Sequence, residues 1–131
     1  MGYRSGRWQR NMVNLTSYSG DYIPVRGDVV EINLDPQKGS EIRKRRPAVV
    51  VSSWNFNLRQ NIAVVCPITR TVRGIGFEVP IPDGLHVDGV IRVDQVKSLD
   101  WRARGVKYLC YLPDKIIDAV SDKIEAIIWG E

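Results

Sequence analysis

The sequence predicts a small, mainly β domain that ends in a single α-helix. Short apolar segments of strand-forming residues recur between residues 25 and 112, and polar turns separate them. The last segment, 113–129, changes to the helical spacing of apolar residues. Many short strands followed by one helix favour a small curled sheet or barrel, and a chain of 131 residues suits one domain with a modest core.

The predicted strands differ in their expected burial. Val30, Ile32 and Leu34 alternate on one face of the first strand, whereas the second and third are nearly all apolar and should be buried on both faces. Pro80 and Pro82 place the fourth strand at a sheet edge. The strands are predicted at 25–34, 48–53, 61–67, 77–81, 89–93 and 108–112, with 94–99 continuing the fifth or bending away. A turn or short helical turn is predicted at 54–57, a hairpin loop at 69–76 and a turn at 101–105.

The terminal helix is predicted to pack one apolar face on the sheet. Its apolar residues recur at helical spacing at Ile116, Val120, Ile124, Ile127 and Ile128. Residues 113–131 carry five acidic and two basic residues, a net charge of −3, while the whole chain carries +4. The rest of the chain therefore carries +7, so a polyanionic partner should bind away from the helix.

The first 20 residues differ from the rest of the chain. They contain three arginines, no acidic residue and no apolar periodicity, so residues 1–20 are predicted to be a flexible tail that could contact nucleic acid. Residues 21–131 would form the folded domain. No apolar run approaches the ~18 residues that a membrane span requires. Cys66 and Cys110 each lie in an apolar segment and are expected to be buried thiols in a reducing cytoplasm.

Several chemistries are excluded by residue type. His86 is the only histidine, so a two-histidine ribonuclease mechanism and a histidine metal cluster are both ruled out. His86 itself is expected in a surface loop. No glycine loop of the P-loop type occurs. The sequence predicts neither a metal site nor a cofactor.

The stretch 35–51 is the centre of the functional prediction. It begins as a loop with five basic and two acidic residues, a net charge of +3, and runs into the apolar segment 48–51. A buried strand would hold the last loop residue, Arg46, firmly. Glu41 and Arg46 flank this loop, and Thr69 ends the neighbouring strand, so the three side chains can converge at one end of the sheet. The alternative is a surface Glu–Arg pair of little energetic value beside an ordinary strand-end threonine.

At these residues the chain resembles the MazF/PemK family of toxin endoribonucleases. The resemblance covers roughly residues 24–129. The motifs that carry it are RGDV at 26–29, LDPQKGSE at 34–41, RPAVV at 46–50, VCPIT at 65–69 and DQVKSLDWRARG at 94–105. One departure is the segment 42–45, which lacks the glycine that many relatives carry in this loop and is unusually basic.

The resemblance implies an SH3-like barrel of the CcdB/PemK/MazF type and a homodimer. It also implies sequence-specific, metal-independent cleavage of single-stranded RNA by an mRNA interferase that a cognate antitoxin inhibits. The family's catalytic residues fall on Glu41, Arg46 and Thr69. RNA supplies its own nucleophile, the 2′-hydroxyl, so the protein must remove a proton, align the phosphate and stabilise a dianionic phosphorane. Arg46 suits charge stabilisation, Glu41 suits the general base, and Thr69 would hydrogen-bond a phosphate oxygen. The products expected from the family are a 2′,3′-cyclic phosphate and a 5′-hydroxyl.

Substrate contacts are expected from the basic loops. The predicted RNA-binding residues are Lys38, Ser40, Arg43, Lys44, Arg45, Arg70, Arg73 and Gln95. Trp54 and Phe56 could stack on bases or belong to the core or a dimer contact. Trp101 is expected to pack inside the fold, with Arg102 and Arg104 bracing loops or the dimer.

Two other functions are compatible with this sequence. A DNA gyrase poison of the CcdB type shares the fold, and the C-terminal residues Trp129 and Gly130 resemble its gyrase-binding end. The catalytic trio argues against it, because a poison has no use for those residues. The other alternative is a non-catalytic RNA-binding barrel.

Overall fold

The computed structural model describes residues 22–34 and 45–130. The predicted tail and the loop residues Lys38, Ser40, Glu41, Arg43 and Lys44 lie outside the described residues, so the predictions made for them stay predictions.

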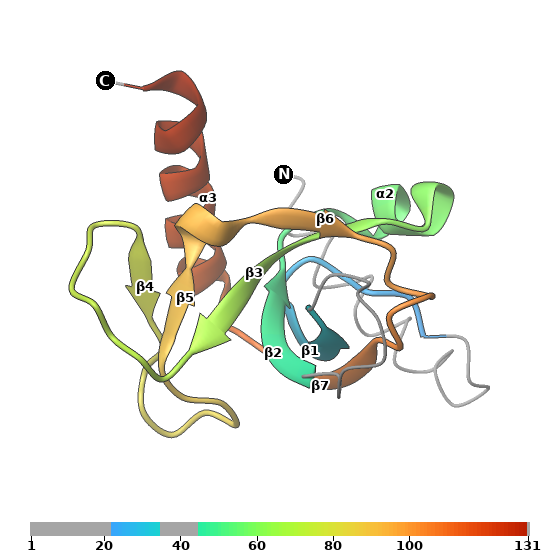
Figure 1. Ribbon diagram of the computed structural model, residues 1–131, viewed down its shortest axis with the longest axis horizontal. Coiled ribbons are helices and arrows are strands. Elements are labelled where there is room, and N and C mark those ends of the chain that lie inside the picture. The colour runs from blue at the N-terminus through green and yellow to red at the C-terminus, as the bar shows by residue number, and fades with distance from the viewer. Residues whose placement is uncertain (1–21, 35–44, 131) are drawn as a thin grey trace, which may run out of the picture.

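Within the described residues, seven strands form one strongly curled antiparallel sheet (Figure 1). The strands are β1 (Asp28–Asn33), β2 (Arg45–Val50), β3 (Ala63–Thr69), β4 (Glu78–Pro80), β5 (Val90–Arg92), β6 (Lys97–Leu99) and β7 (Lys107–Tyr111). Their order is β4-β5-β3-β2-β1-β7, with β6 pairing to β3 off this path. The helices are α2 (Trp54–Gln60), the short 3-10 helix η2 (Val93–Gln95) and α3 (Asp114–Trp129). The predicted β fold with a C-terminal helix is confirmed, and the sheet is barrel-like without closing.

The curl arises at β3, which is long enough to pair with two strands along one edge. Its first half pairs with β6, from Ala63↔Leu99 to Val65↔Lys97, and its last two residues pair with β5. Its other edge pairs with β2. The chain between β5 and β6 turns through η2, so the segment 94–99 bends away, one of the two predicted outcomes. β4 lies at the sheet edge, as its prolines predicted.

Two hydrophobic clusters lie on the two faces of the curled sheet. Because side chains alternate along a strand, β2 contributes to both, with Val49 in one cluster and Ala48 and Val50 in the other. The first cluster lies under α3 and includes Ile116, Ile117 and Val120. The second fills the curl of the sheet and includes Trp101.

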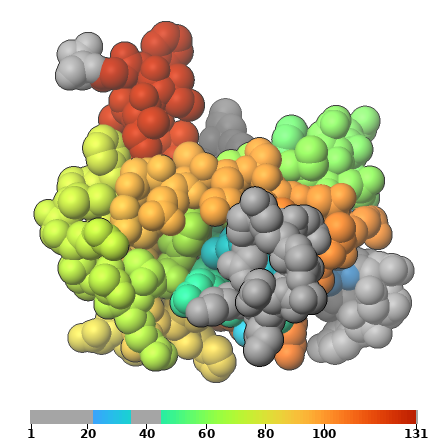
Figure 2. Space-filling model, viewed as in Figure 1, coloured from blue at the N-terminus to red at the C-terminus, as the bar shows by residue number. Residues whose placement is uncertain are grey.

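α3 packs on the sheet as far as Ile124, and its last residues do not. Ile116, Ile117 and Val120 are buried, but Ile127, Ile128 and Trp129 are 41, 70 and 78% exposed. The predicted apolar face is therefore wrong for Ile127 and Ile128. Sixteen helical residues span about 24 Å at 1.5 Å per residue, so the helix projects past the sheet edge. Figure 2 shows this end of α3 standing clear of the surface.

Two predicted boundaries differ from the structure because local capping and pairing override propensity. β2 starts at Arg45 rather than 48, since β1 is long enough to pair Asn33 with Arg45. The turn predicted at 54–57 extends into the seven-residue helix α2. Ser53 Oγ accepts the Phe56 N–H at 3.2 Å as its N-cap. Asn57, which disfavours a strand, is buried in the helix and donates to the Pro24 carbonyl at 2.9 Å.

The turn predicted at 101–105 is present, and its first residue, Trp101, belongs to the second cluster. Trp101 is buried, and its Nε1 donates to the Asn57 carbonyl at 3.1 Å. Arg102 donates to Asn61 Oδ1 at 2.8 Å and Arg104 to the Asn33 carbonyl at 3.0 Å, so both brace loops. Cys66 is buried and Cys110 half-buried, and both are free thiols. None of the helices in the part of the chain described is both long and apolar enough to cross a membrane.

Candidate active site

A cavity of about 510 Å³ opens where β2 begins and β3 ends. Its walls come from three segments: the start of β2, the end of β3 with the two residues after it, and the loop 81–89 between β4 and β5. The residues that line it are Arg46, Pro47, Ile68, Thr69, Arg70, Thr71, Leu85, His86, Val87 and Asp88. The cavity combines three cationic or imidazole side chains with two threonine hydroxyls, which suits an anionic ligand.

Arg46 and Thr69 reach this cavity because β2 and β3 are antiparallel. The register pairs Ala48 with Pro67, so Arg46, two residues before Ala48, and Thr69, two residues after Pro67, lie at the same end of the sheet. Both line the cavity. Their convergence at one end of the sheet was expected from sequence and is observed, while their chemical roles stay predictions.

The Thr69 hydroxyl is held in a definite orientation. Its Oγ1 accepts the Thr71 backbone N–H at 3.1 Å, which uses one lone pair and turns the chain as it leaves β3. A hydroxyl that accepts in this way can still donate its own proton. Thr69 can therefore donate to an oxygen of a phosphate placed in the cavity.

Arg45 faces away from the cavity although it adjoins Arg46. Successive side chains on a strand point to opposite faces. The Arg45 guanidinium donates to the carbonyls of Glu31 at 3.0 Å and Gly105 at 2.5 Å, and it lies 3.7 Å from the Glu31 carboxylate. The structure thus ties Arg45 to the fold, and its predicted RNA contact would require several of these bonds to break.

Arg70 lies at the cavity rim in an ion pair. Its Nε donates to Asp88 Oδ1 at 2.9 Å, and the two side chains are 84 and 72% exposed. This hydrogen bond, with the charge of Asp88, raises the pKa of Arg70 above its ordinary value, although partial burial opposes the effect. The pair joins the loop 81–89 to the segment after β3.

Gly89 brings the same loop against β3. It has φ +112°, and a Cβ built on it would lie 2.3 Å from the Thr69 carbonyl oxygen. Only glycine permits this approach, because the neighbouring atoms are backbone. The contact sets the distance between the loop that carries His86 and the strand end that carries Thr69.

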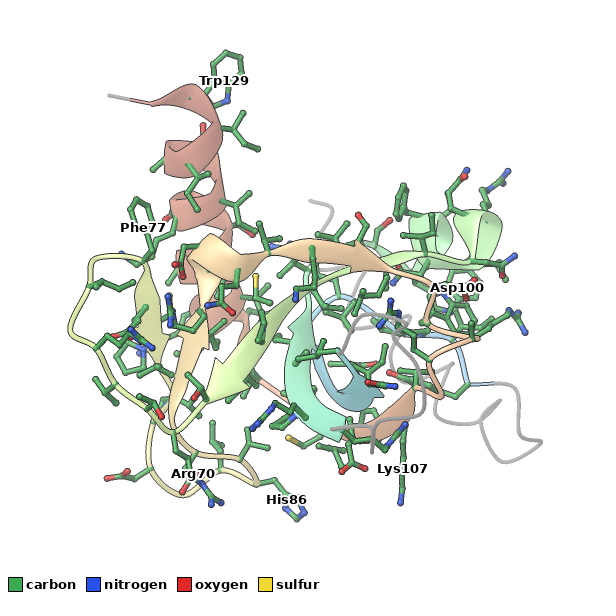
Figure 3. All side chains as sticks on the ribbon, in the orientation of Figure 1. Arg70, Phe77, His86, Asp100, Lys107 and Trp129 are labelled. Atoms are coloured by element: carbon green, nitrogen blue, oxygen red, sulfur yellow. The ribbon has the colours of Figure 1, made fainter. Side chains whose placement is uncertain are left out.

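His86 is the lining residue that sequence reasoning set aside. Its expected place in an exposed loop is confirmed, yet the loop folds over the end of β3 and brings it to the cavity. Figure 3 shows Arg70 and His86 at the same edge of the molecule. The Asp83–Gly84 turn and Gly89, both visible in the sequence, mark the hairpin that returns this loop to the sheet.

Arg73 and Gln95 do not line the cavity. The backbone N–H groups of Arg73 and Gly74 donate to the Glu78 carboxylate at 2.9 and 3.0 Å, which holds the loop between β3 and β4. Gln95 is exposed in η2.

Beside this loop, the guanidinium of Arg92 binds both carboxylate oxygens of Asp94, at 3.0 and 2.7 Å. That hydrogen bond is the main cause that lowers the pKa of Asp94. This pair was not predicted from the sequence, and neither residue lines the cavity.

Trp54 and Phe56 belong to α2, which precedes the start of β3. Thr69 ends β3, so an extended strand of about 20 Å separates the two regions. Phe56 is exposed, and the structure does not bring it to the cavity. Among residues 22–34 and 45–130, no group of three or more His, Cys, Asp or Glu side chains could hold a metal ion.

Comparison with known proteins assigns the family. The family described as "PemK-like, MazF-like toxin of type II toxin-antitoxin system" matches residues 25–128. The endoribonuclease toxin MazF of Escherichia coli strain K12 is 37% identical over 107 residues, which are 82% of this chain and 96% of that protein. The endoribonuclease PemK of Escherichia coli is 34% identical over 79% of this chain and 80% of its own.

A solved structure supports the same assignment at the level of the fold. The crystal structure of MazE-MazF from Deinococcus radiodurans aligns with a TM-score of 0.78 and 36% identity, covering 85% of this chain and all of that one. The profile match over most of the chain and relatives above 30% identity agree with the motifs around Arg46 and Thr69. The chain therefore belongs to the PemK-like, MazF-like family of toxins of type II toxin–antitoxin systems.

Proposed function

We propose that this chain is an endoribonuclease that cuts single-stranded RNA at short sequences and acts as the toxin of a toxin–antitoxin pair. The observation that carries the proposal is that Arg46 and Thr69 line one cavity. Support also comes from the similarity to MazF and PemK, which are both named endoribonucleases.

The cleavage uses the RNA 2′-hydroxyl as nucleophile, so the protein supplies no covalent intermediate. Arg46 holds the phosphoryl oxygens and offsets the charge that develops on the phosphorane, for which a planar and always protonated guanidinium is suited. Thr69 donates a hydrogen bond to a phosphoryl oxygen and fixes its position. Glu41, which precedes β2 in the sequence, removes the 2′-hydroxyl proton. The products are a 2′,3′-cyclic phosphate and a 5′-hydroxyl, and the reaction needs no metal ion.

RNA affinity comes from phosphate contacts around the cavity. Arg70 contacts a phosphate after its ion pair with Asp88 breaks. Breaking this pair costs little free energy because exposed ion pairs are weak. Further contacts come from loop cations and polar side chains. These are Lys38, Ser40, Arg43, Lys44, Arg73 and Gln95, with Arg45 contributing only if it leaves Glu31.

The protein acts as a cytoplasmic homodimer, and a cognate antitoxin blocks its RNA groove. Support for a partner comes from solved complexes of relatives, such as MazE-MazF from Deinococcus radiodurans. A basic groove also suits an acidic inhibitor segment.

The test is cleavage of a ribo-oligonucleotide that contains every short sequence word, in the presence of a chelator. We expect discrete fragments whose 3′ ends carry a cyclic phosphate by mass spectrometry, and no cleavage where the residue before the cut is a 2′-deoxynucleotide. Binding without cleavage would contradict the proposal and favour a non-catalytic barrel. Cleavage that continues after deoxy substitution would exclude the 2′-hydroxyl mechanism.

A gyrase poison is the second candidate, and one observation favours it. Trp129 is 78% exposed at the projecting end of α3, where a partner protein could reach it. A supercoiling assay with purified gyrase separates the two functions. Inhibition that is lost in Trp129→Ala, without RNA cleavage by the unmodified chain, would favour the poison.

A further inference from the structure

The proposed RNA cleavage leaves one proton unassigned, and the cavity contains a side chain that can supply it. When the bond between phosphorus and the 5′-oxygen breaks, its electron pair stays on that oxygen, which leaves as a strongly basic alkoxide unless it is protonated. Glu41 takes the 2′-hydroxyl proton and becomes neutral only as the attack proceeds. A separate acid close to the leaving oxygen would speed the reaction.

Among the described side chains that line the cavity, His86 is best suited to this task. The guanidinium groups of Arg46 and Arg70 hold their protons across the whole physiological pH range. The hydroxyls of Thr69 and Thr71 are weak acids. The carboxylate of Asp88 accepts a hydrogen bond from Arg70 at 2.9 Å. An imidazole exchanges its proton between about pH 5 and 8.

The loop that carries His86 is held against the end of β3 at several points. At its base the Ile81 N–H donates to the Gly89 carbonyl at 3.0 Å. Gly89 lies so close to the Thr69 carbonyl that no side chain fits between them. The next residue, Val90, begins β5 and pairs with Thr69 of β3. Asp88 binds Arg70 at 2.9 Å. These contacts keep His86 at the rim of the cavity.

We propose that His86 is the general acid of this site, a role that rests on the proposed ribonuclease function. The imidazolium of His86 donates its proton to the departing 5′-oxygen while the 2′-oxygen forms its bond to phosphorus and Glu41 receives the 2′-hydroxyl proton. The neutral imidazole is then reprotonated by water. The other charged residues that line the same cavity are Arg46 on β2, Arg70 after β3 and Asp88 on the loop that carries His86.

The experiment compares two oligoribonucleotides under single-turnover conditions, one with the normal linkage and one with sulfur in place of the bridging 5′-oxygen. A thiolate leaves without a proton because thiols are far more acidic than alcohols, with a pKa of about 8.5. For His86→Gln we expect a loss of about 10²-fold or more on the oxygen substrate and of less than about 10-fold on the sulfur substrate. The unmodified protein should slow at high pH on the oxygen substrate, and His86→Gln should lack this decline.

The matched control is Asp83→Asn, an exposed substitution in the same loop that does not line the cavity. It should cut both substrates within about twofold of the unmodified protein. An equal loss on both substrates in His86→Gln would show a binding or structural role and overturn the proposal, as would no loss on either. In both cases cleavage to a cyclic phosphate by the unmodified protein would leave the proposed function standing. Failure of the unmodified protein to cut the oxygen substrate would instead overturn the function and this inference with it.

Discussion

Replacing Gly89 by alanine should damage both stability and cleavage, because Gly89 joins the loop 81–89 to the end of β3 that carries Thr69. The added Cβ would lie 2.3 Å from the Thr69 carbonyl oxygen, 2.9 Å from its carbonyl carbon and 3.2 Å from the Arg70 Cα. All three are backbone atoms, so relief requires the strand end or the loop to move. The backbone at φ +112° adds strain of about 1–3 kcal/mol for a residue with a side chain.

The magnitude follows from adding the two effects. Overpacking against atoms that cannot rotate away costs typically ~1–3 kcal/mol, so Gly89→Ala should lose roughly 2–6 kcal/mol in total. Gly84→Ala is the matched control, because Gly84 also has a positive φ, +88°, but a Cβ there meets no atom within 4 Å. Gly84→Ala should lose only the backbone strain, about 1–3 kcal/mol.

The assay is urea unfolding of the three proteins at one protein concentration, followed by cleavage rates on a single RNA substrate. Gly89→Ala should unfold at lower urea than Gly84→Ala and should cut more slowly at temperatures where it remains folded, because Thr69 is displaced. Gly84→Ala should cut at nearly the rate of the unmodified protein. Equal stabilities and equal rates for the two variants would refute the argument that the Gly89 contact positions the site.

Three further predictions concern the cavity, the neighbouring loop and the core. Arg46→Ala should abolish cleavage while the thermal unfolding midpoint stays nearly unchanged, since Arg46 is exposed; normal cutting by this variant would remove Arg46 from the site. Glu78→Gln should lower the free energy of unfolding by about 1–3 kcal/mol, because an amide nitrogen cannot accept the hydrogen bond from the N–H group of Arg73 or Gly74. It should weaken RNA binding more than it slows the chemical step, and RNA titrations compared with single-turnover rates would separate the two effects. Burial raises the pKa of Cys66 to about 12 from the ordinary 9.0, so between these pH values the folded protein keeps a proton that the unfolded chain loses. The free energy of unfolding should therefore fall as the pH rises from 9 to 12. Urea unfolding of Cys66→Ala should show a smaller decline over the same pH range.

Most of the fold could be predicted because it depends on neighbouring residues. The structure confirms the strand predicted from the alternation in 25–34, the two strands predicted from apolar runs, which are β2 and β3, and the helix predicted from periodicity, which is α3. The helical register of α3 was also correct, but the burial of Ile127 and Ile128 was not. Periodicity states which residues share a face, while burial depends on whether the sheet extends far enough to cover that face.

The candidate site could likewise be predicted only in part from the sequence. Arg46 and Thr69 could be placed together from sequence, because two adjacent antiparallel strands bring the start of one beside the end of the other. Arg45 could not be separated from Arg46 in this way, since its contacts with Glu31 and Gly105 come from strands and turns distant along the chain.

The order of residues along this chain was sufficient to identify a β fold with a terminal helix, the buried strand that follows Arg46, and the family to which the chain belongs. The loop 81–89 was different, because it reads as an ordinary polar hairpin. Its place over the end of β3 depends on the pairing of Val90 with Thr69 and on the close approach that Gly89 permits. Long-range backbone pairing and steric fit therefore bring His86 into the cavity, and neither is encoded in the residues beside it.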